Sequence, residues 1–307
     1  MNSRSLTARC SLLLTAVLAW LGVWLVSPAL RNEGPAYAAP ASYAHDPCAV
    51  YSPKPSELDD CLVPGSNSPE EIFRLLLPDL RTMPPHDLDI VTLADGSREL
   101  RLSNTVWNDG AGPLELEGAF NPVTQSTRVV QHVYQPAGTQ ISSLVGEFTW
   151  HETHDHWHFE KFSLYELWTL TPAGGLDVLV SSSDKVSYCV IDTQVIESQM
   201  EGFSPLKRYG GCGHTLQGLS VGWGDTYKSY LDGQSIQLGA VEDGFYALKS
   251  TANPDGILVE ADYDNNTALI YLDIRGENIA LIDLNGYIRR TCQQAGWWTM
   301  QGIACRM

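Results

Sequence analysis

Residues 150–158 read Trp-His-Glu-Thr-His-Asp-His-Trp-His and lead directly into an apolar run over residues 159–170. Alternate side chains of an extended strand share one face, so His154, His156 and His158 should project to the same side. At about 3.3 Å per residue, the outer two lie about 13 Å apart along the backbone and can lean toward one ion near His156. The run therefore predicts a metal site at the start of a strand.

Imidazole is the commonest metal ligand at neutral pH, and its neutral nitrogen suits copper, zinc, iron or nickel. Three nitrogens on one ion leave open coordination positions, as in a catalytic site. His151 has the opposite parity and should point away unless the strand bends after Glu152. The plainer alternative is a histidine-rich surface strip that binds metal incidentally. The flanking Trp150 and Trp157 favour a site built into the fold.

The first 38 residues have the pattern of a secretory signal. Arg4 and Arg9 precede an apolar stretch over residues 11–30, and Ala36-Tyr37-Ala38 followed by Ala39 resembles a cleavage site. We therefore expect a secreted, extracellular protein, with retention of the stretch as an anchor as the alternative. No later segment has about 20 continuous apolar residues, so no stable membrane insertion is expected after cleavage.

Cysteine usage agrees with export. Cys10 would leave with the signal, and an even number of cysteines would remain, as expected for a disulfide framework. No C-x-x-C spacing of a zinc site is present among them. Proximity in sequence favours the pairs Cys48–Cys61, Cys189–Cys212 and Cys292–Cys305.

The formal net charge is −17. A surface this acidic repels nucleic acid and attracts cationic ligands such as amines or lysine-containing proteins. Simple solubility explains the same charge, so the charge supports an amine substrate without establishing one.

Short apolar or alternating runs broken by Gly, Pro, Asn and Asp fill the chain after residue 88. Such spacing predicts an all-β fold, an antiparallel immunoglobulin-like β-sandwich with long loops and few short helices, in one domain. A Pro/Ser-rich irregular leader should cover residues 39–71, with one short helix opened by Ser68 and Pro69 and running to about Leu76. The expected strands are residues 100–107, 127–134, 159–170, 176–180, 185–191, 236–241, 244–251 and 267–274.

The histidine run resembles the copper-binding signature of the lysyl oxidase family, W-H-x-x-H-x-H-x-H, which is complete from Trp150 to His158. Other family segments follow the same order, so the resemblance covers about residues 72–276 and leaves residues 277–307 as an extension with a disulfide loop. These segments are Pro78-Asp79-Leu80, Lys185-Val186-Ser187-Tyr188-Cys189, Gln217-Gly218-Leu219-Ser220, Gly224-Asp225-Thr226-Tyr227, Asn253-Pro254, Glu260, Asp262-Tyr263, Asn265-Asn266 and Asp273-Ile274-Arg275.

The resemblance implies that His154, His156 and His158 hold copper and that Lys185 and Tyr227 are the precursors of a lysyl tyrosylquinone cofactor. Oxidation of the Tyr227 ring and addition of the Lys185 amine would supply a carbonyl that no ordinary side chain provides. The implied activity is oxidative deamination of lysine ε-amines, in proteins or in other primary amines, to aldehydes with release of ammonia and hydrogen peroxide.

The sequence also departs from the family. Compared with animal members of the family, this sequence has Thr153 in place of a cysteine and Leu164 in place of a histidine. A base role for that histidine therefore does not transfer. We favour Asp225 as the base because it lies two residues from Tyr227, and Glu160 and His214 are the alternatives.

A second metal is implied by hard oxygen ligands of the kind that calcium takes, although a turn built from Asx side chains explains the same residues. Those ligands are Asp79, Asp262, Asn265 and Asn266. Two other functions compete with the oxidase: a non-catalytic secreted immunoglobulin-like module that binds a metal, and, more weakly, a metal-dependent dioxygenase or hydrolase. For the dioxygenase or hydrolase, the sequence shows no carboxylate at a spacing from the histidines that would let it bind the same metal.

Overall fold

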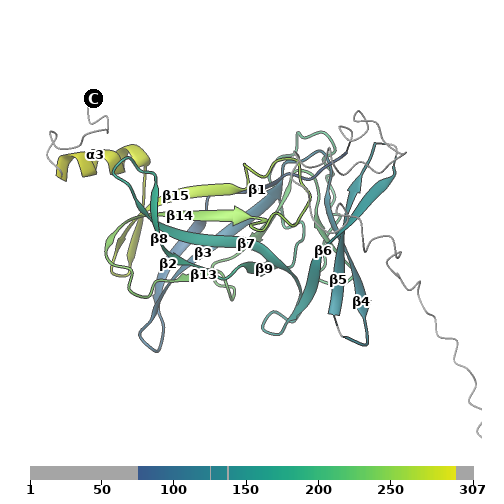
Figure 1. Ribbon diagram of the computed structural model, residues 1–307, viewed down its shortest axis with the longest axis horizontal. Coiled ribbons are helices and arrows are strands. Elements are labelled where there is room, and N and C mark those ends of the chain that lie inside the picture. The colour runs from purple at the N-terminus through teal and green to yellow at the C-terminus, as the bar shows by residue number, and fades with distance from the viewer. Residues whose placement is uncertain (1–74, 125, 137, 295–307) are drawn as a thin grey trace, which may run out of the picture. The chain divides into compact units, whose positions relative to one another are not determined.

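The computed structural model describes residues 75–294, except residues 125 and 137. Within these residues the prediction of an antiparallel all-β fold is confirmed (Figure 1). One sheet has the order β1-β3-β12-β10, with β2 and β13 also paired to β3. Its strands are β1 (Leu80–Thr82), β2 (His86–Thr92), β3 (Arg98–Asn108), β10 (Gln194–Val195), β12 (Trp223–Tyr227) and β13 (Ser235–Gln237).

The larger sheet has the order β11-β4-β5-β6-β7-β14-β15-β16, with β8 and β9 also paired to β7. Every described strand pair in both sheets is antiparallel, as expected for a chain with hairpin connections. The strands are β4 (Leu114–Asn121), β5 (Ser126–Tyr134), β6 (Gln140–His151), β7 (His156–Leu170), β8 (Leu176–Ser182), β9 (Val186–Tyr188), β11 (Leu216–Leu219), β14 (Gly244–Ala252), β15 (Thr267–Arg275) and β16 (Asn278–Ile282).

The core consists of two hydrophobic clusters, and each takes side chains from both sheets. In the first, Val106 of β3 packs with Phe148 of β6 and Phe159 of β7. In the second, Leu102 of β3 packs with Leu248 of β14. Burial of alternate residues on facing strands is what a sandwich requires. The long strand β7 contributes to both clusters, so the residues at its start are anchored by the core.

The predicted runs in residues 100–107, 127–134, 159–170, 244–251 and 267–274 correspond to β3, β5, β7, β14 and β15. The predicted run at residues 176–180 lies in β8. Only short strands occur at the remaining two runs: β9 lies within residues 185–191, and β13 begins one residue before residues 236–241 and ends at Gln237.

The proposed helix from Ser68 to Leu76 lies outside the described residues up to Arg74, and its described end is not helical. Leu76 instead donates its backbone N–H to the Tyr134 carbonyl oxygen at 2.7 Å in an isolated bridge. That bond pairs the chain with the end of β5, so the helical expectation was wrong at Leu76.

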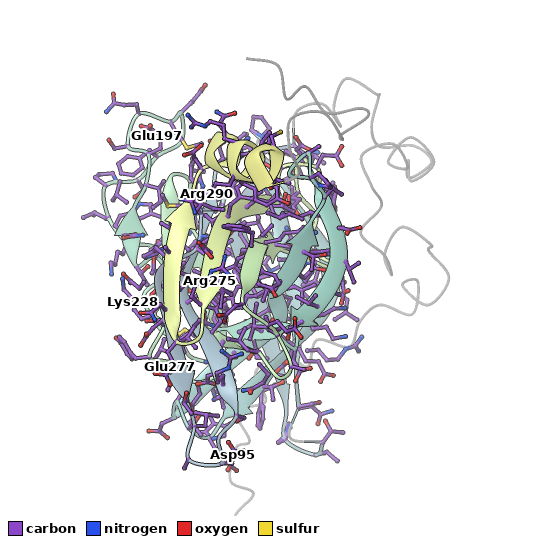
Figure 2. All side chains as sticks on the ribbon, turned by 90° about the vertical axis from the view of Figure 1, so that its left-hand side faces the viewer. Asp95, Glu197, Lys228, Arg275, Glu277 and Arg290 are labelled. Carbon is purple, nitrogen blue, oxygen red and sulfur yellow. A yellow bond between two sulfur atoms is a disulfide. The ribbon has the colours of Figure 1, made fainter. Side chains whose placement is uncertain are left out.

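The last described element is helix α3 (Leu284–Gln294), which the sequence did not predict. The Tyr287 hydroxyl donates to the Thr171 carbonyl oxygen at 3.0 Å. Arg290 and Arg275, both labelled in Figure 2, lie 5.9 and 5.3 Å from the centroid of the Phe245 ring. Strand β16 pairs with β15, so the sheet continues past residue 276, where the family resemblance ended. Among the described residues, no helix is long and apolar enough to cross a membrane.

Candidate functional site

The histidine run forms a β-hairpin. His151 ends β6 and pairs with His156, the first residue of β7. Between them the His151 carbonyl oxygen accepts from the backbone N–H groups of His154 and Asp155, at 3.2 and 2.9 Å. Asp155 has a φ of 56°, a left-handed conformation that aspartate tolerates in turns. The expectation of one extended strand through His154 was therefore wrong, because the chain reverses between His151 and His156.

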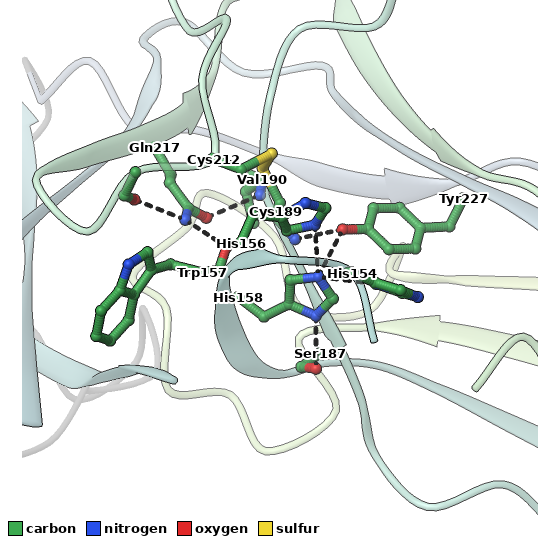
Figure 3. The surroundings of a disulfide bond; sticks show 11 residues. His154, His156, Trp157, His158, Ser187, Cys189, Val190, Cys212, Gln217 and Tyr227 are labelled. Atoms are coloured by element: carbon green, nitrogen blue, oxygen red, sulfur yellow. Dashed lines mark hydrogen bonds between the residues drawn. A yellow bond between two sulfur atoms is a disulfide. The ribbon is translucent and has the colours of Figure 1, made fainter. Parts of the chain in front are cut away.

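The hairpin still brings the three predicted ligands together. His158 Nε2 lies 2.9 Å from His156 Nε2 and 3.2 Å from His154 Nδ1. On its other side, His158 Nδ1 lies 3.0 Å from the Ser187 hydroxyl (Figure 3). A hydrogen bond to the far nitrogen of a ligand histidine fixes its ring orientation and tautomer. The three rings therefore meet at the Nε2 atom of a ring that Ser187 holds in place.

His151 joins the same group because the chain bends after Glu152, the alternative that the sequence left open for this residue. Its ring stacks on His158 with centroids 4.5 Å apart, and its centroid lies 4.3 Å from that of His154. One ring nitrogen from each of His151, His154 and His158 lies within 4.8 Å of the other two. His151 is thus a further candidate ligand.

Burial favours the neutral form of the three predicted ligands, His154, His156 and His158. Burial, followed by the electrostatic effect of the neighbouring histidines, lowers the pKa of His158 to about 3. Burial is also the largest cause of the lowered pKa values of His154 and His156. The buried Nε2 atom of His154 has no hydrogen-bond partner within the described part of the chain. Imidazole nitrogens that converge and favour the neutral state, with a further buried nitrogen of His154 left unpartnered, fit a metal such as copper.

Tyr227 lies beside this group at the end of β12. Its hydroxyl accepts the backbone N–H of Cys189 at 2.5 Å and lies 3.4 Å from His158 Nε2. Its ring stacks on Tyr188 with centroids 3.9 Å apart. The turn before β12 needs glycine, since Gly222 has a φ of 76° and a side chain there would meet the Glu197 carbonyl oxygen. Burial, followed by the charge of Asp225, raises the pKa of the Tyr227 phenol.

Lys185 lies at a cavity that also reaches the histidines. Its Nζ forms an ion pair with Asp255, and Lys161 Nζ lies 4.0 Å from the same carboxylate. Tyr227 does not line the cavity. Its ring is nevertheless stacked on that of Tyr188, which follows Lys185 by three residues. The cavity has a volume of about 480 Å³ and is lined by His151, His158, Ser182, Ser183, Asp184, Lys185, Val186, Ser187, Asp232, Gly233, Ser235 and Gln237.

Asp225 is buried and does not line this cavity. Burial raises the pKa of its carboxyl well above the usual range, and nearby Asp192 raises it further. One Asp225 carboxylate oxygen has no partner among the described residues. The alternative bases also lie outside the cavity lining: Glu160 is half-buried on β7, and the His214 ring lies 5.3 Å from that of Trp157.

A disulfide joins Cys189 to Cys212, the pair that sequence proximity favoured. The other predicted pairs involve cysteines outside the described residues, although Cys292 is disulfide-bonded. The Cys212 carbonyl oxygen accepts the backbone N–H of Trp157, a residue of the hairpin, at 3.0 Å. Because Cys189 donates to Tyr227, this bridge links the histidines to the phenol (Figure 3).

Two polar side chains at the site have roles that sequence reasoning did not assign. Gln217 donates from Nε2 to the Trp157 carbonyl oxygen at 2.9 Å and accepts the Val190 N–H at 2.9 Å. Asp255 pairs with Lys185. Gln217 stood inside a quoted family segment and Asp255 directly followed Asn253-Pro254, but only the folded chain shows their partners.

Three of the four proposed calcium ligands, all except Asp262, belong to what we call the amide–carboxylate cluster, formed by Asp79, Asn253, Glu260, Asn265 and Asn266. Asn265 Nδ2 donates to both Asp79 oxygens at 3.0 Å. Glu260 accepts from Asn253 and Asn266 at 2.6 and 2.7 Å, and burial raises its pKa to about 7. Asp262 lies close enough to Asp79 to raise the pKa of that carboxyl, after the larger effect of burial.

Comparison with known proteins places the chain in a family. A sequence model described as lysyl oxidase matches residues 127–283, about half of the chain. Human lysyl oxidase homolog 1 is 36% identical over 132 residues, which cover 43% of this chain and 21% of that protein. Protein-lysine 6-oxidase of Gallus gallus is 35% identical over 127 residues, 41% of this chain and 27% of the relative.

Lysyl oxidase homolog 2A of Danio rerio is 37% identical over 120 residues, 39% of this chain and 15% of that protein. The chain thus spans about a quarter or less of the length of these three relatives. The family model begins within β5 and contains the whole histidine hairpin, Lys185 and Tyr227. The chain belongs to the lysyl oxidase family.

Proposed function

We propose that the chain is a secreted, copper-dependent amine oxidase that deaminates lysine ε-amines or other primary amines to aldehydes. One observation carries the proposal: three neutral imidazoles converge on His158 Nε2, and the Tyr227 hydroxyl lies 3.4 Å from that atom. A metal at these nitrogens would have an oxidisable phenol beside it. The relatives named protein-lysine 6-oxidase support the choice of substrate class.

His154, His156 and His158 would hold the copper, and His151 lies near enough to replace or join them. Lys185 and Tyr227 would be joined in the lysyl tyrosylquinone. Bound together, copper and quinone supply the oxidation of the amine and the return of its electrons to dioxygen, with release of ammonia and hydrogen peroxide.

The chain's own residues would place these groups. The Cys189 backbone N–H fixes the Tyr227 oxygen, and the Ser187 hydroxyl fixes the His158 ring. Lys185 reaches the cavity on a long, exposed side chain, so its Nζ can leave Asp255 by rotation of that chain. The two exposed carboxylates of the cavity lining, Asp184 and Asp232, would attract a cationic amine.

Asp225 is our proposed base for proton removal from the carbon next to the amine nitrogen. This role requires the carboxyl to lose its proton despite burial and to gain access to the cavity. Asp225→Asn should therefore lower kcat while leaving the quinone colour intact. If Glu160→Gln or His214→Asn has that effect instead, the base is assigned to that residue.

A calcium ion at Asp79, Asp262, Asn265 and Asn266 would stabilise the fold. The buried Oδ1 atoms of Asn265 and Asn266 have no hydrogen-bond partner in the described part of the chain, and amide oxygens are calcium ligands. Millimolar calcium should raise the Tm of the intact protein, and Asp79→Asn should remove that increase.

Aerobic copper loading tests the oxidase proposal. The loaded protein should develop a quinone colour, react with a hydrazine and release peroxide from primary amines. Lys185→Arg keeps a cation for Asp255 but removes the primary amine, so it should abolish all three signals, as should Tyr227→Phe. The matched control Lys161→Arg, which alters the other lysine near Asp255, should retain them.

A copper-loaded protein without colour or peroxide release would instead support the non-catalytic metal-binding module. In that case Lys185→Arg and Tyr227→Phe would change nothing that these assays measure, while bound metal would still raise the Tm.

A further inference from the structure

We propose that Cys189, Cys212 and His156 form a second metal site when the Cys189–Cys212 disulfide is reduced. The two sulfur atoms and one ring nitrogen of His156 lie within 4.8 Å of one another. Figure 3 shows the His156 ring beside the sulfur–sulfur bond. Two thiolates and an imidazole are a soft donor set that suits zinc or monovalent copper, with a coordination position left open.

The redox step is simple. A reductant of the phosphine or dithiol class gives two electrons, and the sulfur–sulfur bond breaks to leave two thiols that take up two protons. Each thiol then loses its proton to water as it binds the metal, since the thiolate is the ligand. No further oxidant or cofactor is needed.

Backbone bonds should keep the thiols near His156 after reduction, because none of them uses sulfur. The Trp157 N–H donates to the Cys212 carbonyl oxygen at 3.0 Å, and the Cys189 N–H donates to Tyr227 at 2.5 Å. Gln217 adds a bridge between Trp157 and Val190, the residue after Cys189. The hairpin is thus bonded directly to Cys212, through Tyr227 and His158 to Cys189, and through Gln217 to the residue after Cys189.

His156 is the residue that the two sites share. Its Nε2 lies 2.9 Å from His158 Nε2, so it also belongs to the imidazole group. His151, His154 and His158 form a separate group of three that does not include His156. Reduction would therefore let His156 bind with the thiols while His151 takes its place among the imidazoles.

Cobalt(II) titration of the full chain, reduced with a phosphine under anaerobic conditions, tests this proposal. Reduced protein should show thiolate-to-cobalt charge-transfer absorption that saturates at one equivalent, and oxidised protein should show none. His156→Asn should weaken this cobalt binding at least about tenfold, since even partners of metal ligands are worth that much. The matched variant His154→Asn, which alters only the imidazole group, should change it less than threefold.

The double variant Cys189→Ser/Cys212→Ser controls for the other cysteines, which reduction also frees, and it should lack the absorption. Equal absorption in the double variant, or equal weakening by His156→Asn and His154→Asn, would overturn the proposal. A reduced chain that has lost its fold would give the second of these results, because the two histidine variants would then weaken cobalt binding equally. The readout does not depend on amine oxidation, so this proposal and the oxidase can fail separately.

Discussion

The histidine hairpin and the amide–carboxylate cluster are both polar groups that the sequence suggested as metal sites, but they are built differently. In the cluster, donors meet acceptors: Asn265 faces Asp79, and Asn253 and Asn266 face Glu260. In the hairpin, like groups meet, because His154 and His156 both direct a ring nitrogen at His158 Nε2.

A group of complementary donors and acceptors satisfies most of its own hydrogen bonds, whereas neutral nitrogens that face one another need a proton or a cation between them. The difference teaches that the hairpin depends on a bound ion more than the cluster does. It also separates the consequences of mutation. Substitutions in the hairpin should mainly lower metal affinity, and substitutions in the cluster should mainly lower the stability of the metal-free fold.

The largest expected effect is on copper affinity. His158→Asn removes the nitrogen at which the other rings meet, so the Kd for copper should rise at least about 100-fold, beyond the loss typical of a ligand's partner. Competition with a chromophoric chelator measures it. Asn266→Ala, in the cluster, should leave this Kd unchanged, and an equal loss in both variants would remove the distinction between the regions.

Glu260→Ala should have the largest effect on stability. It leaves the Leu80 N–H and the amides of Asn253 and Asn266 without their buried acceptor, which should cost roughly 3–5 kcal/mol. Urea unfolding of the metal-free protein measures the loss. Glu260→Gln keeps an acceptor oxygen and should cost less. A loss below about 1 kcal/mol in the alanine variant would show that the cluster does not stabilise the fold.

Acid should destabilise the metal-free hairpin. The pKa of His158 is lowered from 6.5 to about 3, so the folded state favours the neutral ring. The stability contributed by that preference is present above pH 6.5 and lost as the pH falls toward 3. Over the 2.5 units between pH 6.5 and pH 4, the loss should be on the order of 3 kcal/mol, since one pKa unit equals about 1.4 kcal/mol.

Unfolding free energies measured from pH 7 to pH 4 test this expectation. His158→Asn should make the dependence on pH less steep over that range. If the unfolding free energy of this variant depends on pH as steeply as that of the unaltered protein, then the pKa of His158 is the same in the folded and unfolded states.

The smallest expected effect concerns the partner of the central ring. Ser187→Ala removes the hydroxyl at 3.0 Å from His158 Nδ1, so copper affinity should fall about tenfold with little change in unfolding free energy. Ser182→Ala, which also alters the cavity lining, is the matched control and should have no such effect. Equal Kd values for both variants would remove the orienting role of Ser187.

Strands that bury long apolar runs could be predicted from the sequence, because the order of apolar and polar residues along a strand reflects which of its faces are buried. Residues 159–170 and 244–251 are examples, and they became the paired strands β7 and β14. The reversal at residues 152–155 could not be predicted, since this turn contains no glycine and depends on Asp155 in a left-handed conformation. Alternating histidines therefore looked like one strand.

The site itself was only partly visible in the sequence. The identity of the three central histidines followed from their spacing, and their convergence is present despite the different backbone path. The inclusion of His151 required knowledge of the turn. The pairing of Lys185 with Asp255 joins residues 70 positions apart, and periodicity carries no information about contacts at that separation.

Peptide mapping of the copper-loaded protein tests the central claim most directly. After aerobic incubation with copper and proteolysis, the peptides that contain Lys185 and Tyr227 should appear as one covalently joined species, absent from the metal-free protein and from His158→Asn. Full occupancy of the histidines by copper, with the two peptides recovered separately and unmodified, would contradict the account.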